Sequence, residues 1–320
     1  MCYSAMLEAE FRKMSRELGF RISFEEFVRM YQDRLKDRKL IKVPKMMGLT
    51  FANPETSEEQ QIKALIDQYR IDQAAEWESE LFGQSRRLAD AERSLVAKET
   101  KKARNDQRVA TKKIDWYKDK LADLKSPVLQ PADCRIFPMW YAPVITVEDG
   151  EYVVRPMRYH CRPNGKPAFY DKKYDGLYNA RRDSLEKFWK GLFGRRHAVM
   201  LATSFYENVA LHNYEKRELR PGEEPSNVVL HFNPRQSEPM LVACLWDRWQ
   251  APGQSDLLSF TAITDEPPPE VAATGHDRCV IPLKREHLAA WLNPMERDKA
   301  ELYAILDDRE RPYYEHRMAA

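Results

Sequence analysis

The chain has 320 residues, of which 43% are hydrophobic and 32% are charged, and its formal net charge at pH 7 is +2. This length suits one large domain or two smaller ones, and the composition excludes a collagen-like or disulfide-dense scaffold. No apolar run approaches the roughly 18 residues of a membrane span, and no apolar signal region follows the first residues. We therefore expect a cytoplasmic protein without a membrane partner.

The near-neutral total charge hides segments of unlike charge. Residues 151–220 carry 15 basic and 8 acidic side chains, whereas residues 221–320 carry 10 basic and 17 acidic ones. The basic segment can attract a polyanion, unless the acidic segment folds against it and cancels its charge. The five cysteines form no Cys-X-X-Cys pair, which favours reduced thiols over disulfides or a zinc site.

Two short helices are predicted first. Apolar residues at spacings of four, three and four predict a helix over Ala5–Leu18, which Gly19 would end. A second helix is predicted to begin at Ser23, where Glu26 would complete a capping box. The following stretch, Lys42–Pro54, is expected to be a loop.

Residues 55–125 have the composition of long, exposed helix. They contain no proline, one glycine, 15 basic and 15 acidic residues. Ser57 with Gln60 offers an N-terminal cap. Gly83 either breaks the segment into a two-helix hairpin or is tolerated within one rod, and the pattern leaves both open.

Large apolar residues disappear between Ala97 and Gln107, so this coiled-coil-like insertion does not sustain a full coiled-coil seam. One face of the predicted helix carries four basic residues, Lys101, Arg104, Arg108 and Lys112. Such a face is more often a solvated surface than a contact with nucleic acid. The insertion is also a candidate surface for a protein partner.

Beyond Pro127, short β-rich runs separated by turns predict an antiparallel mixed domain. The predicted strands are Tyr141–Val147, Tyr152–Val154, Ala198–Thr203, Val228–Phe232, Met240–Trp246, Leu257–Ile263 and Cys279–Leu283. Helices are predicted over Asp183–Phe193, Arg285–Leu292 and Pro294–Asp307. We therefore expect an α+β body formed by residues 1–54 and 126–320, which the helical insertion 55–125 interrupts.

Removal of Met1, usual before a small residue, would leave Cys2 with a free α-amine. The ordinary pKa values of an α-amine and a thiol, about 8 and about 8.5, make both groups partly available as nucleophiles near neutral pH. With an aldehyde, the amine forms a Schiff base and the thiol then closes on the imine carbon to give a thiazolidine. The Met-Cys start alone is a weak signal.

Three further motifs follow Met-Cys in order: YNARRDSL at Tyr178–Leu185, SFYEN at Ser204–Asn208 and GHDRCVIPL at Gly275–Leu283. Supporting motifs are WYAP at Trp140–Pro143, ACLWDRW at Ala243–Trp249 and FTAITDEPPPEV at Phe260–Val271. As a set, these motifs resemble the SOS response-associated peptidase (SRAP) family. The resemblance covers residues 1–4 and about 136–295.

The resemblance implies a barrel-like, antiparallel β-rich body with peripheral helices. It also implies a DNA-damage protein that binds single-stranded DNA, cross-links to abasic sites through its N-terminal cysteine and has autopeptidase activity. In a bacterium such a protein would associate with the nucleoid. The implied catalytic residues are Cys2, Asn179, Glu207 and His276, and the implied DNA-binding residues are Arg158, Tyr159, Arg181, Arg182 and Thr264. No cofactor or metal ion is implied.

Each implied role makes chemical sense. The carboxyl group of Glu207 suits the proton transfer that opens the closed abasic sugar, and His276 suits proton transfer as the imine forms and cyclises. The Asn179 amide can hold the amine or a sugar oxygen, and Arg181 can grip a phosphate. The plainer interpretations are a surface carboxylate for Glu207 and a turn closed by a salt bridge for His276.

The chain also departs from the family pattern. Tyr3, Ser4 and Ala5 replace the usual Gly-Arg-Phe, so an arginine contact to phosphate is missing, and Tyr159 replaces the tryptophan of a Trp-Gly pair. Two alternative functions remain at this point. One is an N-terminal nucleophile amidohydrolase, although no Gly-rich oxyanion loop is found, and the other is an interaction scaffold that works through the insertion.

Overall fold

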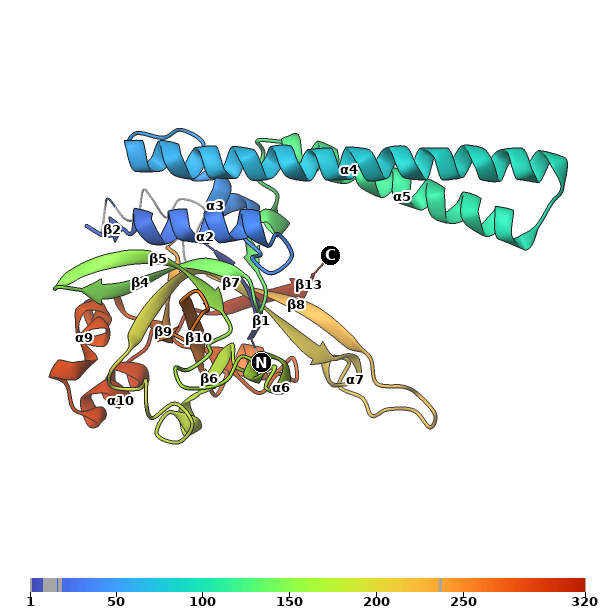
Figure 1. The fold of residues 1–320 in the computed structure, drawn as a ribbon. Coiled ribbons are helices and arrows are strands. Elements are labelled where there is room, and N and C mark those ends of the chain that lie inside the picture. The colour runs from blue at the N-terminus through green and yellow to red at the C-terminus, as the bar shows by residue number, and fades with distance from the viewer. Residues whose placement is uncertain (1, 8–15, 17–18, 236–237, 320) are drawn as a thin grey trace.

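The computed structural model describes residues 2–7, 16, 19–235 and 238–319, with Cys2 and Tyr3 described by their backbone. Its architecture is α+β, as predicted: a mostly antiparallel sheet of 13 strands forms the body, and helices cover it (Figure 1). Among the described helices, none is both long enough and apolar enough to cross a membrane.

Five strands close into a barrel, which confirms the predicted barrel-like body. They pair in the order β9–β10–β5–β4–β7, and β7 pairs back with β9. The β10–β5 pair is parallel and the other pairs of the ring are antiparallel. The barrel strands are β4 (Tyr141–Glu148), β5 (Glu151–Tyr159), β7 (His197–Ala210), β9 (Met240–Trp249) and β10 (Leu257–Asp265). All five overlap predicted strands, because short apolar, β-rich runs bounded by turns mark strands that are buried on both faces.

Shorter strands extend this barrel. Strands β1 and β8 flank the C-terminal half of β7, β3 pairs with β1, and β13 pairs with β8. Strands β6 and β11 both pair with β10, and β2 and β12 pair with β5 and β9. Their bounds are β1 (Cys2–Leu7), β2 (Arg21–Ile22), β3 (Arg135–Ile136), β6 (Asn179–Arg181), β8 (Asn227–Pro234), β11 (Cys279–Val280), β12 (Pro282–Leu283) and β13 (Tyr314–Met318).

Helices lie over the barrel and along its ends (Figure 1). The α-helices are α2 (Phe24–Lys36), α3 (Lys45–Leu49), α4 (Ser57–Ala97), α5 (Lys101–Lys125), α6 (Tyr170–Lys173), α7 (Leu211–Tyr214), α8 (Pro269–Ala272), α9 (Leu288–Leu292) and α10 (Lys299–Asp307). Single 3₁₀ turns cover Pro131–Cys134, Arg182–Ser184, Arg285–His287 and Pro294–Glu296.

Helices α4 and α5 form a long hairpin that spans the predicted insertion and reaches beyond the body (Figure 1). Gly83 is tolerated inside α4, and the chain reverses instead at residues 98–100. Thr56 caps α4 by accepting a hydrogen bond from the Glu59 N–H, so the predicted cap at Ser57 is wrong by one residue.

The structure corrects three predictions near the N-terminus. Residues 5–7 belong to strand β1 and not to a helix, because β7 supplies a pairing partner that no local pattern reveals; much of the rest of that predicted helix lies outside the described residues. The expected loop Lys42–Pro54 contains the short helix α3. Ser23 caps α2 without a side-chain hydrogen bond, and Glu26 instead binds Arg248, with 2.9 Å between Oε1 and Nη2.

The helix predicted over Asp183–Phe193 is also wrong. After the 3₁₀ turn the chain continues as turns, in which hydrogen bonds to the third preceding residue recur, such as Leu192 N–H to the Trp189 carbonyl at 2.8 Å. Gly191 and Gly194 weaken a helix here, because glycine loses the most backbone freedom on folding. Most apolar residues of this segment are nevertheless buried, although Phe188 is exposed, and their spacing is the signal that made the segment resemble a helix.

Candidate functional site

Strand pairing brings two of the predicted catalytic residues to one place in the sheet. The register of β1 on β7 sets the backbone of Cys2 opposite Glu207, and β8 flanks Glu207 on the other side at Leu230. A bulge lies between Cys2 and Ser4, and bulges re-aim strand residues beside functional sites. Glu207 is fully buried, at 0% exposure, so it is not the surface carboxylate of the plainer interpretation.

His276 is the partner of that buried carboxylate. Its Nε2 lies 3.1 Å from Glu207 Oε2, and its side chain is almost fully buried. His276 comes from the loop between α8 and β11, far along the chain from β7. The Asp277–Arg278 salt bridge also forms, at 3.0 Å, so the turn and the ion pair to Glu207 coexist. A buried imidazole beside a carboxylate can move protons without access to bulk water.

Gly275 fixes the approach of His276, and the sequence prediction missed it although it directly precedes the histidine. Its φ is +90°, and a Cβ built there would lie 2.7 Å from the Cβ of Asn213. The backbone therefore needs glycine for two reasons, the left-handed conformation and the close contact.

Gly275→Ala is expected to lower the free energy of unfolding by more than about 2 kcal/mol and to displace His276. Gly222→Ala is a matched control, because Gly222 has a φ of +78° but no atom within 4 Å of the added Cβ. The control should cost only about 1 kcal/mol for the backbone conformation. Urea denaturation compares the two variants, and equal losses would contradict the clash at Asn213.

Asn179 is held at the start of strand β6, next to Ala262 of β10. The Tyr159 hydroxyl donates a hydrogen bond to Asn179 Oδ1, with an oxygen–oxygen distance of 3.4 Å. Tyr159 is itself fully buried and stacks on Phe260, with ring centroids 5.1 Å apart. This contact orients the Asn179 amide, whose NH₂ group is the hydrogen-bond donor that a substrate oxygen requires.

Three of the predicted DNA-binding residues meet at one small cavity. It has a volume of about 120 Å³, and Arg181, Arg182 and Thr264 line it together with Arg278, which the sequence prediction did not include. The acidic residues Asp183, Asp265 and Glu266 also line this cavity. Thr264 Oγ1 is buried and has no hydrogen-bond partner among the described residues. Asp277, the neighbour of His276, lines the same cavity.

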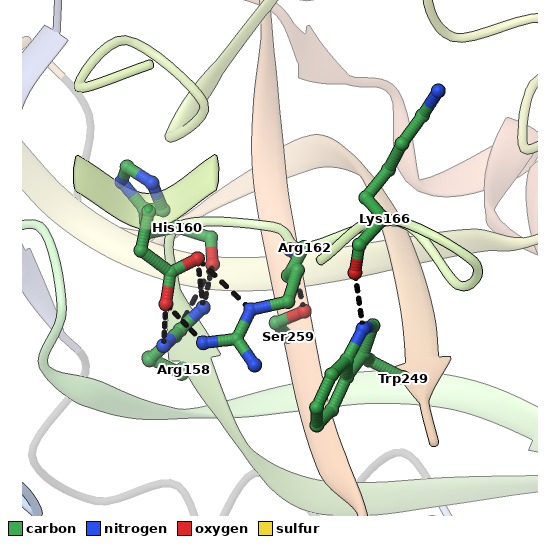
Figure 2. Close-up of polar contacts among 7 residues, drawn as sticks. Arg158, His160, Arg162, Lys166, Trp249 and Ser259 are labelled. Atoms are coloured by element: carbon green, nitrogen blue, oxygen red, sulfur yellow. Dashed lines mark hydrogen bonds and ion pairs between the residues drawn. The ribbon is translucent and has the colours of Figure 1, made fainter. Parts of the chain in front are cut away.

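The other two predicted DNA-binding residues are placed differently. Arg158 is buried beside Asp171, with 2.8 Å between Nη1 and Oδ2, and Arg162 binds the same carboxylate (Figure 2). Burial acts to raise the pKa of Asp171, but hydrogen bonds from the two arginines outweigh it and lower that pKa. Arg158 and Tyr159 point to opposite faces of β5, since neighbouring strand residues alternate. Neither side chain is exposed, so the DNA-contact proposal below does not rest on them.

Carboxylates of the acidic segment 221–320 bind some of the arginines in the basic segment 151–220. Arg182 binds Asp265 at 3.1 Å and Asp307 at 2.7 Å, and Arg196 approaches Asp247 at 3.5 Å. Arg181 is more exposed and binds only Asp183, at 3.2 Å, among the ion pairs of the described residues. The acidic C-terminal segment therefore folds against part of the basic one, and the charges of the two segments partly cancel there.

The remaining thiols and metal-type ligands do not enter this site. Cys134, Cys161, Cys244 and Cys279 are all buried. Burial raises the pKa of the Cys279 thiol, and the nearby charge of Glu207 raises it further. Within the described residues, one group could share a metal ion, Glu286, His287 and Asp308, but Lys284 Nζ already lies 2.5 Å from Asp308.

Comparison with known proteins gives consistent matches. The family described as SOS response associated peptidase (SRAP) matches residues 93–319. The abasic site processing protein YoqW of Bacillus subtilis (strain 168) is 30% identical over 133 residues, which cover 41% of this chain and 54% of that protein. YoqW of Bacillus phage SPbeta matches equally. The chain thus spans about half the length of the curated relatives it matches.

Solved structures give weaker matches. A crystal structure from Bacteroides thetaiotaomicron has a TM-score of 0.46 at 16% identity and covers 58% of this chain and 78% of its own. A phage-related protein from Bordetella bronchiseptica has a TM-score of 0.45 at 16% identity and covers 61% and 85%. Cys2 precedes the family match, whereas Asn179, Glu207 and His276 lie within it. Because that match extends over more than half of the sequence, the chain belongs to the SRAP family.

Proposed function

We propose that this protein is an abasic-site sensor that binds single-stranded DNA and forms a covalent thiazolidine through Cys2 after removal of Met1. The observation that carries the proposal is the buried Glu207–His276 pair, in which the two side chains lie 3.1 Å apart. Glu207 occupies the position of β7 that pairs with the backbone of Cys2. The names of the relatives, abasic site processing proteins, agree with this substrate.

The first chemical step opens the sugar. An abasic deoxyribose is mainly a closed hemiacetal, and opening it moves a proton from the O1 hydroxyl to the ring oxygen. The carboxyl group of Glu207 can accept the first proton and return one to the ring oxygen. Its burial keeps bulk water from competing for that proton.

The second step joins the protein to the aldehyde. The α-amine of Cys2 adds to C1′, and the carbinolamine loses water to give an imine. The thiol sulfur then adds to the imine carbon while its proton goes to the nitrogen, which closes a five-membered ring without an oxidant or a cofactor. His276 can deliver the proton that helps water leave, and it can then carry the thiol proton from the sulfur to the nitrogen.

The DNA strand needs contacts beside the reacting sugar. The cavity of Arg181, Arg182 and Thr264 supplies guanidinium groups and an unpartnered hydroxyl next to the loop of His276. Both groups donate hydrogen bonds to phosphate oxygens. Phosphate contacts of this kind position a strand without reading its sequence, which suits a lesion that lacks a base.

The test is incubation of the mature protein with an oligonucleotide that contains one abasic site, followed by denaturing electrophoresis. We expect a denaturation-resistant adduct with the wild-type chain and none with Cys2→Ala. Cys134→Ala is the control, because that thiol is buried and should leave adduct formation intact. Mass spectrometry of the N-terminus reports whether Met1 is absent from the reacting form. An adduct with Cys2→Ala, or none with the wild type, would refute the proposal.

A different outcome of these assays would favour the alternative hypothesis, an N-terminal nucleophile amidohydrolase. Release of ammonia from glutamine, without any adduct, would assign Cys2 to nucleophilic hydrolysis in which the α-amine acts as the base. The same assay on the Met1-retaining form tests the role of the amine itself. That form should be inert in the cross-linking reaction, because its α-amine belongs to another residue.

A further inference from the structure

The α4–α5 hairpin is neutral as a whole, but its two ends carry opposite charge. The part of α4 nearest the body, residues 57–82, has seven acidic and two basic residues. The distal part, residues 83–113, has ten basic and four acidic residues. The distal segment therefore has a net charge of +6, against +7 for the basic segment 151–220 of the body, in fewer than half as many residues.

Most of the distal basic side chains have no carboxylate partner. Three of the four acidic residues are already paired, since Asp90 binds Arg93, Glu99 binds Arg104 and Asp106 binds Arg87. The basic residues without an ion pair among the described residues are all exposed: Arg86, Lys98, Lys101, Lys102, Arg108, Lys112 and Lys113. In the basic segment of the body, Arg158, Arg162 and Arg182 are bound to carboxylates, whereas exposed lysines such as Lys172 and Lys187 have no ion pair among the described residues.

The hairpin is fixed to the body at one end only. Near the body, Arg38 binds Glu76 at 3.0 Å and Lys45 binds Asp123 at 3.1 Å, and Ile62 and Ile66 join the main core. Residues 83–113 are all described, and every hydrogen bond and ion pair the structure shows for them stays within the hairpin. Figure 1 shows this end projecting past the barrel. It is a rigid arm with a positively charged end.

We infer that the distal arm, residues 83–113, binds the phosphate backbone of duplex DNA beside the single-stranded lesion; this inference rests on the proposed function. Seven exposed cations, none with a carboxylate partner in the described part of the chain, complement a polyanion. The segment contains no Phe, Tyr or Trp, so it lacks the stacking surfaces with which proteins hold single strands. It therefore fits a duplex, whose bases are stacked already and whose phosphates face outward.

The dimensions of the arm suit this partner. Residues 83–97 of α4 rise by roughly 20 Å, at about 1.5 Å per residue, and duplex DNA presents about one charge per 1.7 Å of its axis. A length of duplex equal to the arm thus carries roughly a dozen phosphates, and the arm meets those on the near side. Between the two helices lies a hollow of about 540 Å³, to which Arg86, Arg87 and Lys102 contribute. The acidic stretch nearer the body would repel DNA there, so the phosphates would meet only the distal end.

The test compares undamaged DNA probes, which cannot cross-link. Fluorescence anisotropy measures the affinity of the full-length chain for a 30-base-pair duplex and for a 30-nucleotide single strand at several salt concentrations. The distal variant Lys101→Gln with Arg108→Gln and Lys112→Gln should weaken duplex binding about tenfold or more at 0.1 M salt. The slope of log affinity against log salt should fall by about 2 to 3, because three phosphate contacts are lost.

The control variant Lys118→Gln with Lys120→Gln and Lys125→Gln removes the same charge from the part of α5 nearest the body. It should change duplex affinity less than threefold, and neither variant should alter single-strand affinity or cross-linking to an abasic single strand. The inference would be overturned if the distal variant bound duplex DNA as tightly as the wild type does. It would also be overturned if both variants lost the same duplex affinity, or if the distal variant lost as much affinity for single strands as for the duplex. Absence of cross-linking in the wild type would refute the proposed function separately.

Discussion

Glu207→Gln is expected to slow adduct formation with an abasic oligonucleotide by about 10²- to 10⁴-fold, while the affinity for undamaged DNA stays the same. The substitution keeps the size and shape of the side chain but removes its ability to accept and return a proton. Glu207 is fully buried and its carboxylate lies 3.1 Å from His276 Nε2, so no water or neighbouring carboxylate can easily replace it. Single-turnover rates with excess protein measure the effect.

A matched control and a double variant identify the cause. Glu224→Gln changes an exposed carboxylate, removes the same charge and should leave the rate unchanged. If Glu207 and His276 act as one unit, the variant with both Glu207→Gln and His276→Gln should be no slower than the slower single variant. Additive losses, or a normal rate for Glu207→Gln with a normal melting temperature, would contradict proton transfer through this pair.

The body of the fold was predictable from sequence because its long strands contain short apolar, β-rich runs bounded by turns, and nearly all of their residues are buried. The long strands β4, β7, β9 and β10 each contain a predicted strand. The prediction for residues 5–7 was wrong because their apolar spacing fits a helix, while their strand partner, β7, is about 200 residues away in the sequence. Local patterns carry no information on such pairing, so the tertiary contact overrides the local preference.

The residues of the site could be predicted from the motifs, but the geometry of the site could not. The motifs identified Glu207 and His276, and only the fold shows that Glu207 Oε2 lies 3.1 Å from His276 Nε2. Arg158 was selected for its charge and its place near a motif. Its direction depends on the alternation of β5, which points it to Asp171 and away from Asn179. Charge in a sequence does not reveal which carboxylates fold against it.

Three buried histidines should dominate the acid stability of the fold. Burial lowers the pKa of His160 and of His231 to about 4 and that of His197 to about 3, from an ordinary value of 6.5. His197 Nε2 accepts the Gly194 N–H at 2.9 Å and Nδ1 donates to the Trp291 carbonyl at 3.0 Å. Protonation of Nε2 would break the first of these hydrogen bonds.

His160 has the least favourable surroundings of the three. Neither of its ring nitrogens has a hydrogen-bond partner among the described residues, and its φ is +146°, a conformation that favours glycine. It follows Tyr159, at the second position of the pair that the family commonly writes Trp-Gly. A glycine at this position would adopt the φ of +146° without strain, whereas this chain places a buried imidazole there.

Each of these histidines binds a proton more tightly in the unfolded chain than in the folded one. Their contribution to stability is therefore complete above about pH 6.5 and is lost as the pH falls from 6.5 towards 4. Near pH 5 the unfolded chain holds between two and three more protons at these sites. Because each proton contributes about 1.4 kcal/mol per pH unit, the free energy of unfolding should fall by about 3 to 4 kcal/mol per pH unit.

Urea denaturation at pH 5.0, 5.5, 6.0 and 7.5 measures this slope. A loss of that size over two pH units approaches the whole stability of a typical domain, so the protein should unfold between about pH 4 and pH 5.5 without denaturant. His160→Gly should reduce the slope by about one proton, or 1.4 kcal/mol per pH unit, because it removes one buried imidazole and accepts the φ of +146°. A wild-type slope below 1.4 kcal/mol per pH unit would show that these histidines are already protonated in the folded state.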